Sequence, residues 1–337
     1  MHGEHFKRLT EGLRPVASHR DLLAHVSANF RRIDQASLEV IERSLRQNVF
    51  APLVSGGERD VLAYLATQAG RTDLEDHLHV RLGHARETVV PWLASVTALS
   101  GKNVLEIGCG TGSSTVALAE QGALVTALDV DEMGIKVAKD RCKAVGVTAA
   151  LHLGNASKVR EIFPGRRFDM VILYAALEHM THDERLAAMQ GTWELLDRGG
   201  HWCVLETPNR LWYFDSHTSL LPFYFWLPDD LAIKYSRFSP RQSFNAAYSG
   251  HGDREMLEFL RRGRGVSFHE FDLTLGKVES LKVLTSLTGF LRRQSLTTRL
   301  HAWRSEDGRY ERLLKRVGPK IHEGFYHRNL DLIIEKC

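Results

Sequence analysis

The residues whose types and spacing could do chemistry lie between positions 103 and 131. Three alternate glycines stand there, at Gly108, Gly110 and Gly112. Because glycine has no side chain, a ligand can approach the backbone and the start of the next helix. Asp129 stands where a second parallel strand would end, and its carboxylate can accept hydrogen bonds from ribose hydroxyls. The stretch therefore predicts a nucleoside site. Position 113 is serine, so the spacing differs from the dinucleotide G-x-G-x-x-G.

The glycines must be positioned by an α/β unit. Residues 104–107 and 124–129 are short apolar runs that predict buried parallel strands, and 113–120 between them predicts a helix. Further strands are expected at 149–153, 168–174, 201–206 and 329–336, with a helix at 133–145. Residues 195–200 are expected to end a helix at a glycine stop. We expect 265–271 to lead into the sixth strand and 281–316 to be helical.

At LEIGCGTG, positions 105–112, the sequence resembles the class I S-adenosylmethionine-dependent methyltransferases, and the resemblance covers roughly residues 100–208. It implies an α/β fold with a seven-stranded, mostly parallel, doubly wound sheet whose last strand is antiparallel. It also implies S-adenosyl-L-methionine as cofactor and S-adenosyl-L-homocysteine as product. The cofactor-binding residues that it implies are Glu106, Gly108, Cys109, Gly110, Gly112, Asp129, Val130, Asn155, Ala156 and Tyr174.

The resemblance also gives these positions roles. The glycines line the methionine and ribose portion of the cofactor, Glu106 helps to place the methionine ammonium group, and Asp129 holds the ribose. Asn155 stands where the family usually carries an acid that contacts the adenine amino group, and its amide oxygen can still accept that bond. Tyr174, at a strand end, faces the reaction zone together with Glu178 and His179.

The methyl acceptor is expected to be a small molecule that binds to an aromatic-rich lid. Arginines in the lid favour a carboxylate, because the guanidinium group matches carboxylate geometry, and Arg210 and Arg241 are the candidates. The lid loosely resembles that of methyltransferases that esterify small dicarboxylic acids. The alternative is a sugar or phenol hydroxyl, with His179, His217 or His269 as general base. A third alternative is a catalytically silent subunit that still binds the cofactor.

Four segments are expected along the chain. They are a helical N-terminal extension (1–98), the cofactor-binding core (99–208), a substrate-binding lid inserted after the fifth strand (209–272), and C-terminal helices with the closing strand (273–337). We expect the N-terminal helices to pack over the core; a cap over the cofactor, or a homodimer face, is the sharper alternative. His77, His79 and His84 are interpreted as solvated helix histidines, and no metal is expected.

Composition excludes several classes. A formal net charge of +3 is too small to indicate nucleic-acid binding. The four cysteines form no C-x-x-C pair and predict reduced thiols. No apolar run approaches the roughly 18 residues of a membrane span, and the start of the chain lacks an apolar signal core. We therefore expect a cytoplasmic protein without membrane or nucleic-acid partners.

Overall fold

The structure is a computed structural model that describes residues 19–54, 58–245, 252–294 and 296–337. The first 18 residues of the expected N-terminal extension and residues 246–251 of the expected lid lie outside the described residues. None of the helices in the described ranges is long and apolar enough to cross a membrane.

Seven strands form one sheet in the order β3-β2-β1-β4-β5-β7-β6. Strands β1 to β5 are parallel, and β7 is antiparallel to both β5 and β6. The strands are β1 Asn103–Ile107, β2 Leu124–Asp129, β3 Ala150–Leu153, β4 Phe168–Tyr174, β5 Leu196–Pro208, β6 Lys282–Ser286 and β7 Asn329–Glu335. This confirms the predicted seven-stranded sheet with an antiparallel last strand.

The register of the central strands sets the position of the site. Ile107 of β1 pairs with Leu128 of β2 and with Leu173 of β4, so the three strands end at one edge of the sheet. Asp129 and Tyr174 follow at that edge. Parallel α/β sheets bind their ligands beyond the carboxyl ends of the strands, so this edge is where a site is expected.

The N-terminal part is helical. Its elements are α2 His19–Ser27, α3 Gln35–Leu45, α4 Ala51–Val54, α5 Glu58–Leu65, α6 Gln68–Glu75, α7 Arg81–His84 and α8 Val90–Ala94, with the π-helical turns η1 Arg46–Phe50, η2 Asp76–Val80 and η3 Ala85–Val89. The helix continues from Gln68 to Ala94 through Pro91. Pro91 directly follows the π-helical turn η3, at the second residue of α8.

Helices also flank the other parts of the sheet. Those of the core are α9 Ser113–Glu120, α10 Glu132–Val145, η4 Ala156–Lys158, α11 Val159–Ile162, η5 Leu177–His179 and α12 His182–Glu194. The segment after β5 contains η6 Tyr224–Trp226, α13 Asp229–Tyr235, η7 Ser236–Phe238, α14 Gln242–Asn245, α15 Asp253–Arg261 and α16 Phe268–Thr274. The last are α17 Leu287–Arg293, α18 Leu296–Arg304, α19 Glu306–Val317 and η8 Glu323–Tyr326.

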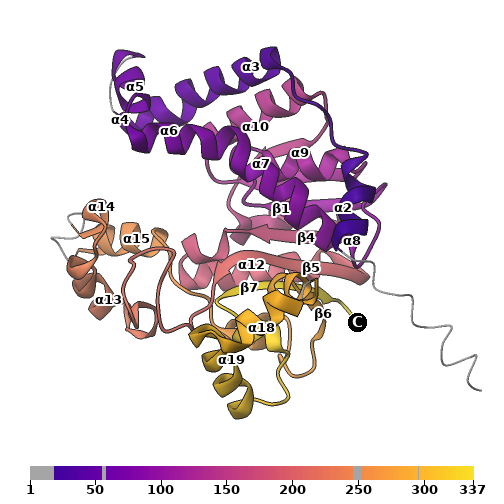
Figure 1. Cartoon of the computed structure of the whole chain (residues 1–337), viewed down its shortest axis with the longest axis vertical. Helices are drawn as coiled ribbons and strands as arrows, with labels where there is room; N and C mark the ends of the chain where they lie inside the picture. The colour runs from indigo at the N-terminus through magenta and orange to yellow at the C-terminus, as the bar shows by residue number, and fades with distance from the viewer. Residues whose placement is uncertain (1–18, 55–57, 246–251, 295) are drawn as a thin grey trace, which may run out of the picture.

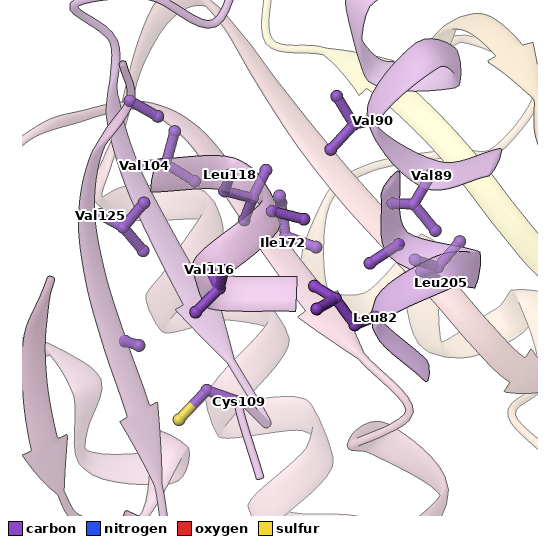
Figure 2. Close-up of a cluster of buried hydrophobic side chains, with 14 of the residues drawn as sticks. Leu82, Val89, Val90, Val104, Cys109, Val116, Leu118, Val125, Ile172 and Leu205 are labelled. Carbon is purple, nitrogen blue, oxygen red and sulfur yellow. The ribbon is translucent and has the colours of Figure 1, made fainter. Parts of the chain in front are cut away.

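The N-terminal helices and one face of the sheet share a hydrophobic core. Leu82 and Val89 of the long helix belong to the same buried cluster as Ile172 of β4 and Leu205 of β5 (Figure 2). Helix α3 packs on α10, and α7 packs on α9. The N-terminal helices therefore lie directly on one face of the sheet and on helices α9 and α10 (Figure 1).

Two further clusters complete the interior. The opposite sheet face, with Val171 and Trp202, packs on α12 and on Phe271 of α16. The segment after β5 has a small core of its own, which includes Tyr224 and Phe259. In Figure 1, helices α13, α14 and α15 of this segment form a group apart from the N-terminal helices.

Three local predictions were wrong. Residues 195–200 do not end a helix at a glycine: α12 ends at Glu194, and the stretch begins β5, with an irregular register opposite β4 that accommodates the glycines. Residues 265–271 do not lead into a strand, because Ser267 and Glu270 form a capping box that begins α16. The sixth strand is β6, inside the stretch expected to be helical.

Candidate functional site

A cavity of about 730 Å³ lies at the carboxyl edge of the sheet. The loops after β1, β2, β3 and β4 line it, together with Glu206 from β5 and residues between Asp76 and His84 of the N-terminal helix. Of the predicted site residues it brings together Gly108, Cys109, Gly110, Asp129, Val130, Asn155, Ala156, Tyr174 and His179. The N-terminal helix therefore forms a wall of the cavity.

The glycine loop is held in a conformation that other residues rarely adopt. Gly108, Gly110 and Gly112 have φ values of +84°, +48° and +81°. A Cβ at Gly108 would lie 2.5 Å from the carbonyl oxygen of Tyr174, whereas a Cβ at Gly110 would meet nothing within 4 Å. Gly112 does not line the cavity; a Cβ there would lie 2.8 Å from Ala138 of α10. Gly112 thus serves packing, and Gly110 leaves room for a ligand.

Cys109 lines the cavity but its side chain serves the core. The side chain is 4% exposed and belongs to the cluster of Figure 2. Burial raises the pKa of the Cys109 thiol well above its usual range. Its contribution to a ligand is therefore through the backbone, and its sulfur is not a nucleophile.

Asp129 and Asn155 both line the cavity. The Asp129 carboxylate accepts hydrogen bonds from the N–H groups of Gly110 (2.7 Å) and Asp131 (2.9 Å), one at each oxygen. The amide oxygen of Asn155 accepts from the N–H of Ser157 at 2.9 Å. Each of these oxygens has a second lone pair for a ligand.

Part of the cavity lining is aliphatic. Val130 is 66% exposed and Val80 of the N-terminal helix is 54% exposed, although both line the cavity. Ala156 also lines the cavity. Exposed aliphatic side chains beside a pair of polar acceptors suit a flat heteroaromatic ring.

Glu106 is placed differently from the prediction. It is fully buried in β1 and does not line the cavity. Its carboxylate accepts hydrogen bonds from the hydroxyl groups of Ser114 and Thr115 of α9, the latter at 2.5 Å. The expected contact of Glu106 with a ligand ammonium group is therefore replaced by a connection between the strand and α9.

A hydrogen-bonded network crosses the cavity between β4, β5 and the N-terminal helix. The Nε2 atom of His84 lies 3.1 Å from Oε1 of Glu206, to which the Tyr174 hydroxyl also donates at 3.0 Å. The hydrogen bond to Glu206 raises the pKa of His84 above its ordinary value. Such a histidine–carboxylate pair can accept a proton from a ligand hydroxyl.

The backbone of Glu206 is hydrogen-bonded to a buried acid, Asp331. Glu206 has a φ of +55°, a left-handed conformation, and its N–H donates to Oδ1 of Asp331 at 2.6 Å. Asp331 lies on β7, and burial raises its pKa to about 7. Non-glycine residues with positive φ persist where the surroundings impose them, and they cluster at functional sites.

His179 and His217 lie next to each other. Their ring centroids are 5.6 Å apart, and both face the buried carboxylate of Glu178. His179 lines the cavity, whereas His217 does not. Burial raises the pKa of Glu178 to about 8.

Arg210, Arg241 and His269 do not line the cavity, contrary to the roles predicted for them. Arg241 donates to the carbonyl oxygens of His217 (2.8 Å) and Thr218 (3.1 Å), so it holds a loop. His269 is exposed and stacks on Phe268 at the start of α16. The half-buried Arg210 bonds through its backbone to Val266. The sequence places these residues in the lid segment, but it does not show which way their side chains point.

Two other arginines reach the cavity. Arg81 pairs with Asp76 at 2.6 Å, and Arg261 of α15 pairs with Glu184 at 2.7 Å. Arg261 is the only lid residue among those that line the cavity, as far as the described chain shows. The lid rings expected to build a substrate pocket pack mainly on one another.

Sequence reasoning missed His84 and Glu206. His84 was grouped with solvated histidines because it stands in a helix without ligand spacing. One signal was available: Glu206, like Tyr174, stands near the carboxyl end of a buried parallel strand, where ligands bind. The helix spacing of Asp76, Val80 and His84, four residues apart, also places these three on one face.

Comparisons with known proteins agree with this geometry. Residues 104–200 match the family model described as "Methyltransferase domain". Ubiquinone biosynthesis O-methyltransferase of Pseudomonas aeruginosa (strain LESB58) is 34% identical over 121 residues, 36% of this chain and 50% of that protein. The enzyme of the same name from Thiobacillus denitrificans is 32% identical over 119 residues, 35% of this chain and 50% of that protein. The chain thus spans about half the length of these curated relatives.

Among solved structures, magnesium protoporphyrin IX methyltransferase of Synechocystis PCC 6803 with bound SAH is 18% identical, with a TM-score of 0.41. The match covers 66% of this chain and 80% of that chain.

Proposed function

We propose, from the premise that residues 104–200 form a methyltransferase domain of the class I, S-adenosylmethionine-dependent type, that this protein methylates an oxygen atom of a small molecule. The acceptor that the cavity suits best is a hydroxyl group. The observation that carries this choice is the His84–Glu206 pair, which is a ready proton acceptor on the cavity wall.

The residues present fit S-adenosylmethionine. Gly110 leaves open space beside the backbone, the Asp129 carboxylate can accept from ribose hydroxyls, and Val80 and Val130 offer apolar surface for an adenine ring. When bound, S-adenosylmethionine supplies a methyl group that is already activated on a sulfonium. The protein is left to bind, to orient the acceptor, to exclude water and to manage one proton.

Removal of the proton from the acceptor hydroxyl is the step for which the chain itself provides side chains. A hydroxyl is a weak nucleophile until a base takes its proton, and a positioned base contributes about 10²–10⁴-fold to the rate. Glu206 orients His84 and stabilises the imidazolium that would form. Tyr174 donates to the same carboxylate and fixes it. Because the carboxylate and the ring come from β5 and the N-terminal helix, the base depends on their packing.

The test is release of S-adenosylhomocysteine on a panel of small phenols, sugars and mono- or dicarboxylic acids. We expect turnover on hydroxyl compounds that falls at least tenfold in His84→Gln, with cofactor affinity unchanged by calorimetry. His79→Gln is the matched control, because His79 is an exposed histidine on the same helical run. Full activity of His84→Gln on every accepted hydroxyl compound would refute the proposed base.

A second candidate is methyl transfer to a carboxylate, which was the first expectation from the sequence. Arg81 and Arg261 line the cavity and favour an anionic acceptor. A carboxylate is already ionised near neutral pH, so no base is needed. Turnover confined to the acids, lost in Arg81→Gln or Arg261→Gln but kept in His84→Gln, would select this candidate.

A further inference from the structure

Three ligand-type side chains converge beside the cavity. Oε1 of Glu178 lies 3.9 Å from Nε2 of His179 and 3.8 Å from Nε2 of His217. One ligand atom from each of the three residues lies within 4.8 Å of the others. Glu178 and His179 belong to the turn η5 after β4, whereas His217 comes from the segment after β5.

The hydrogen bonds assign the protons of the His179 ring. Its Nδ1 atom lies 2.9 Å from the carbonyl oxygen of Arg261. A carbonyl oxygen can only accept, so Nδ1 of His179 carries a hydrogen. In a neutral ring the Nε2 atom then presents a lone pair to Glu178. This tautomer is assigned from the network of contacts.

The same argument holds for His217. Its Nδ1 atom lies 3.0 Å from the hydroxyl oxygen of Thr218. That hydroxyl is within 3.3 Å of the carbonyl oxygen of Gly263, to which it donates, so it accepts from His217. The Nε2 atom of His217 therefore also presents a lone pair to Glu178. Metal-binding histidines are oriented in this manner, with the second nitrogen donating to an oxygen.

Glu178 adds a third acceptor. Its side chain is fully buried, and among the described residues no donor lies within hydrogen-bond distance of Oε1. The other oxygen has only the Thr207 hydroxyl, at 3.4 Å. A buried carboxylate oxygen facing two imidazole lone pairs is unfavourable unless a cation stands between them.

We propose that Glu178, His179 and His217 form a binding site for a divalent transition-metal ion of the zinc class. Two imidazole nitrogens and one carboxylate oxygen are a ligand set that such ions accept, and Mg²⁺ prefers oxygen ligands instead. Ligand atoms around a tetrahedral zinc ion are about 3.4 Å apart, from bond lengths of about 2.0–2.2 Å. The observed separations of 3.8 and 3.9 Å are close to this spacing.

The site revises the expectation from the sequence that no metal is needed. That expectation came from the sequence alone, in which His217 stands too far from His179 for the two to be recognised as a pair of ligands. Because His179 also lines the cavity, the ion would lie at the cavity wall. The proposal does not depend on the proposed function, since metal binding is measured without turnover.

The experiment uses the full chain without an affinity tag, stripped with a chelator. Zn²⁺ is titrated by calorimetry, and Co²⁺ is followed by its visible absorption, which reports the ligand geometry. We expect one equivalent of each ion to bind, Mg²⁺ to leave the protein unchanged, and Zn²⁺ to raise the melting temperature. If the wild-type chain binds neither Zn²⁺ nor Co²⁺, the proposal is overturned. The three side chains would then share a proton instead of a metal ion.

Variants locate the ion. His217→Ala is the main test, because this ring is partly exposed and its loss should leave the fold intact. It should weaken Zn²⁺ affinity at least tenfold and remove the thermal shift, and Glu178→Gln should do the same. The matched control is His269→Ala, an exposed histidine outside the cluster. Wild-type Zn²⁺ affinity in a folded His217→Ala protein would assign the ion to other histidines and refute the site.

Discussion

The Nε2 atom of His84 lies 3.1 Å from Oε1 of Glu206, which connects the N-terminal helix to the end of β5 across the cavity. This contact joins two segments that lie far apart in the sequence. It makes the N-terminal helix part of the site, because its residues Asp76, Val80 and Arg81 line the same cavity.

The pH dependence of turnover should follow the protonation of His84 in this pair. His84 accepts a proton only when its ring is neutral, and its pKa is raised by the hydrogen bond to Glu206. With a hydroxyl acceptor, kcat/KM should therefore rise with pH through an inflection above about 6.5, the ordinary histidine value. Glu206→Gln removes the charge and should move the inflection to lower pH. An identical profile in both proteins would show that another group is the base.

Asp129 should control cofactor affinity. Its carboxylate holds the N–H groups of Gly110 and Asp131, and its remaining lone pairs face the cavity. Asp129→Ala should weaken binding of S-adenosylhomocysteine about 10-fold or more, since hydrogen bonds to charged groups contribute about 1.5–3 kcal/mol. Asp129→Asn keeps one acceptor and should lose less. Calorimetry gives both affinities, and equal values for all three proteins would contradict the assignment.

Asp331 should make the fold less stable at high pH. Burial raises its pKa to about 7, whereas the unfolded chain titrates near 4. The folded state therefore holds a proton that the unfolded state has lost, and stability falls as pH rises from about 4 to 7. Asp331→Asn keeps an acceptor for the N–H of Glu206 and removes the titration.

At pH 8 we expect the unfolding free energy of the Asp331→Asn protein to exceed that of the wild type by at least about 2 kcal/mol. This follows from the raised pKa, because each pKa unit corresponds to about 1.4 kcal/mol. At pH 4 the two should be nearly equal. Urea denaturation at the two pH values measures the difference. A gain of the same size at both would mean that the charge of Asp331 plays no part.

Glu270 should be important for stability, and its neighbour His269 should not. Both Glu270 oxygens accept from Nη1 of Arg185, at 3.1 and 3.2 Å, and both side chains are buried. Glu270→Ala leaves the Arg185 charge unpaired and should cost about 3–5 kcal/mol. His269→Ala should change stability by less than about 0.5 kcal/mol and leave turnover unchanged. Thermal melts measure the stability of both variants, and the methyl-transfer assay measures the turnover of His269→Ala. A large loss of turnover in His269→Ala would make His269 a candidate for the base again.

The local pattern of the sequence determined the cofactor half of the protein. Apolar runs, alternate glycines and an acid at a strand end are short-range signals, because they reflect burial and backbone conformation within a few residues. They predicted β1, α9, β2 and β4 with nearly the observed bounds. They also placed Gly110 and Asp129 at one cavity.

Tertiary structure alone decided the contacts between distant segments at the cavity. His84 meets Glu206, and His217 meets Glu178, only because separate segments pack at one edge of the sheet. The arginines chosen from composition point elsewhere because side-chain direction depends on packing, as the backbone contacts of Arg241 show. Residue type indicates what a group can do, but proximity between distant segments is set by the buried core that they share.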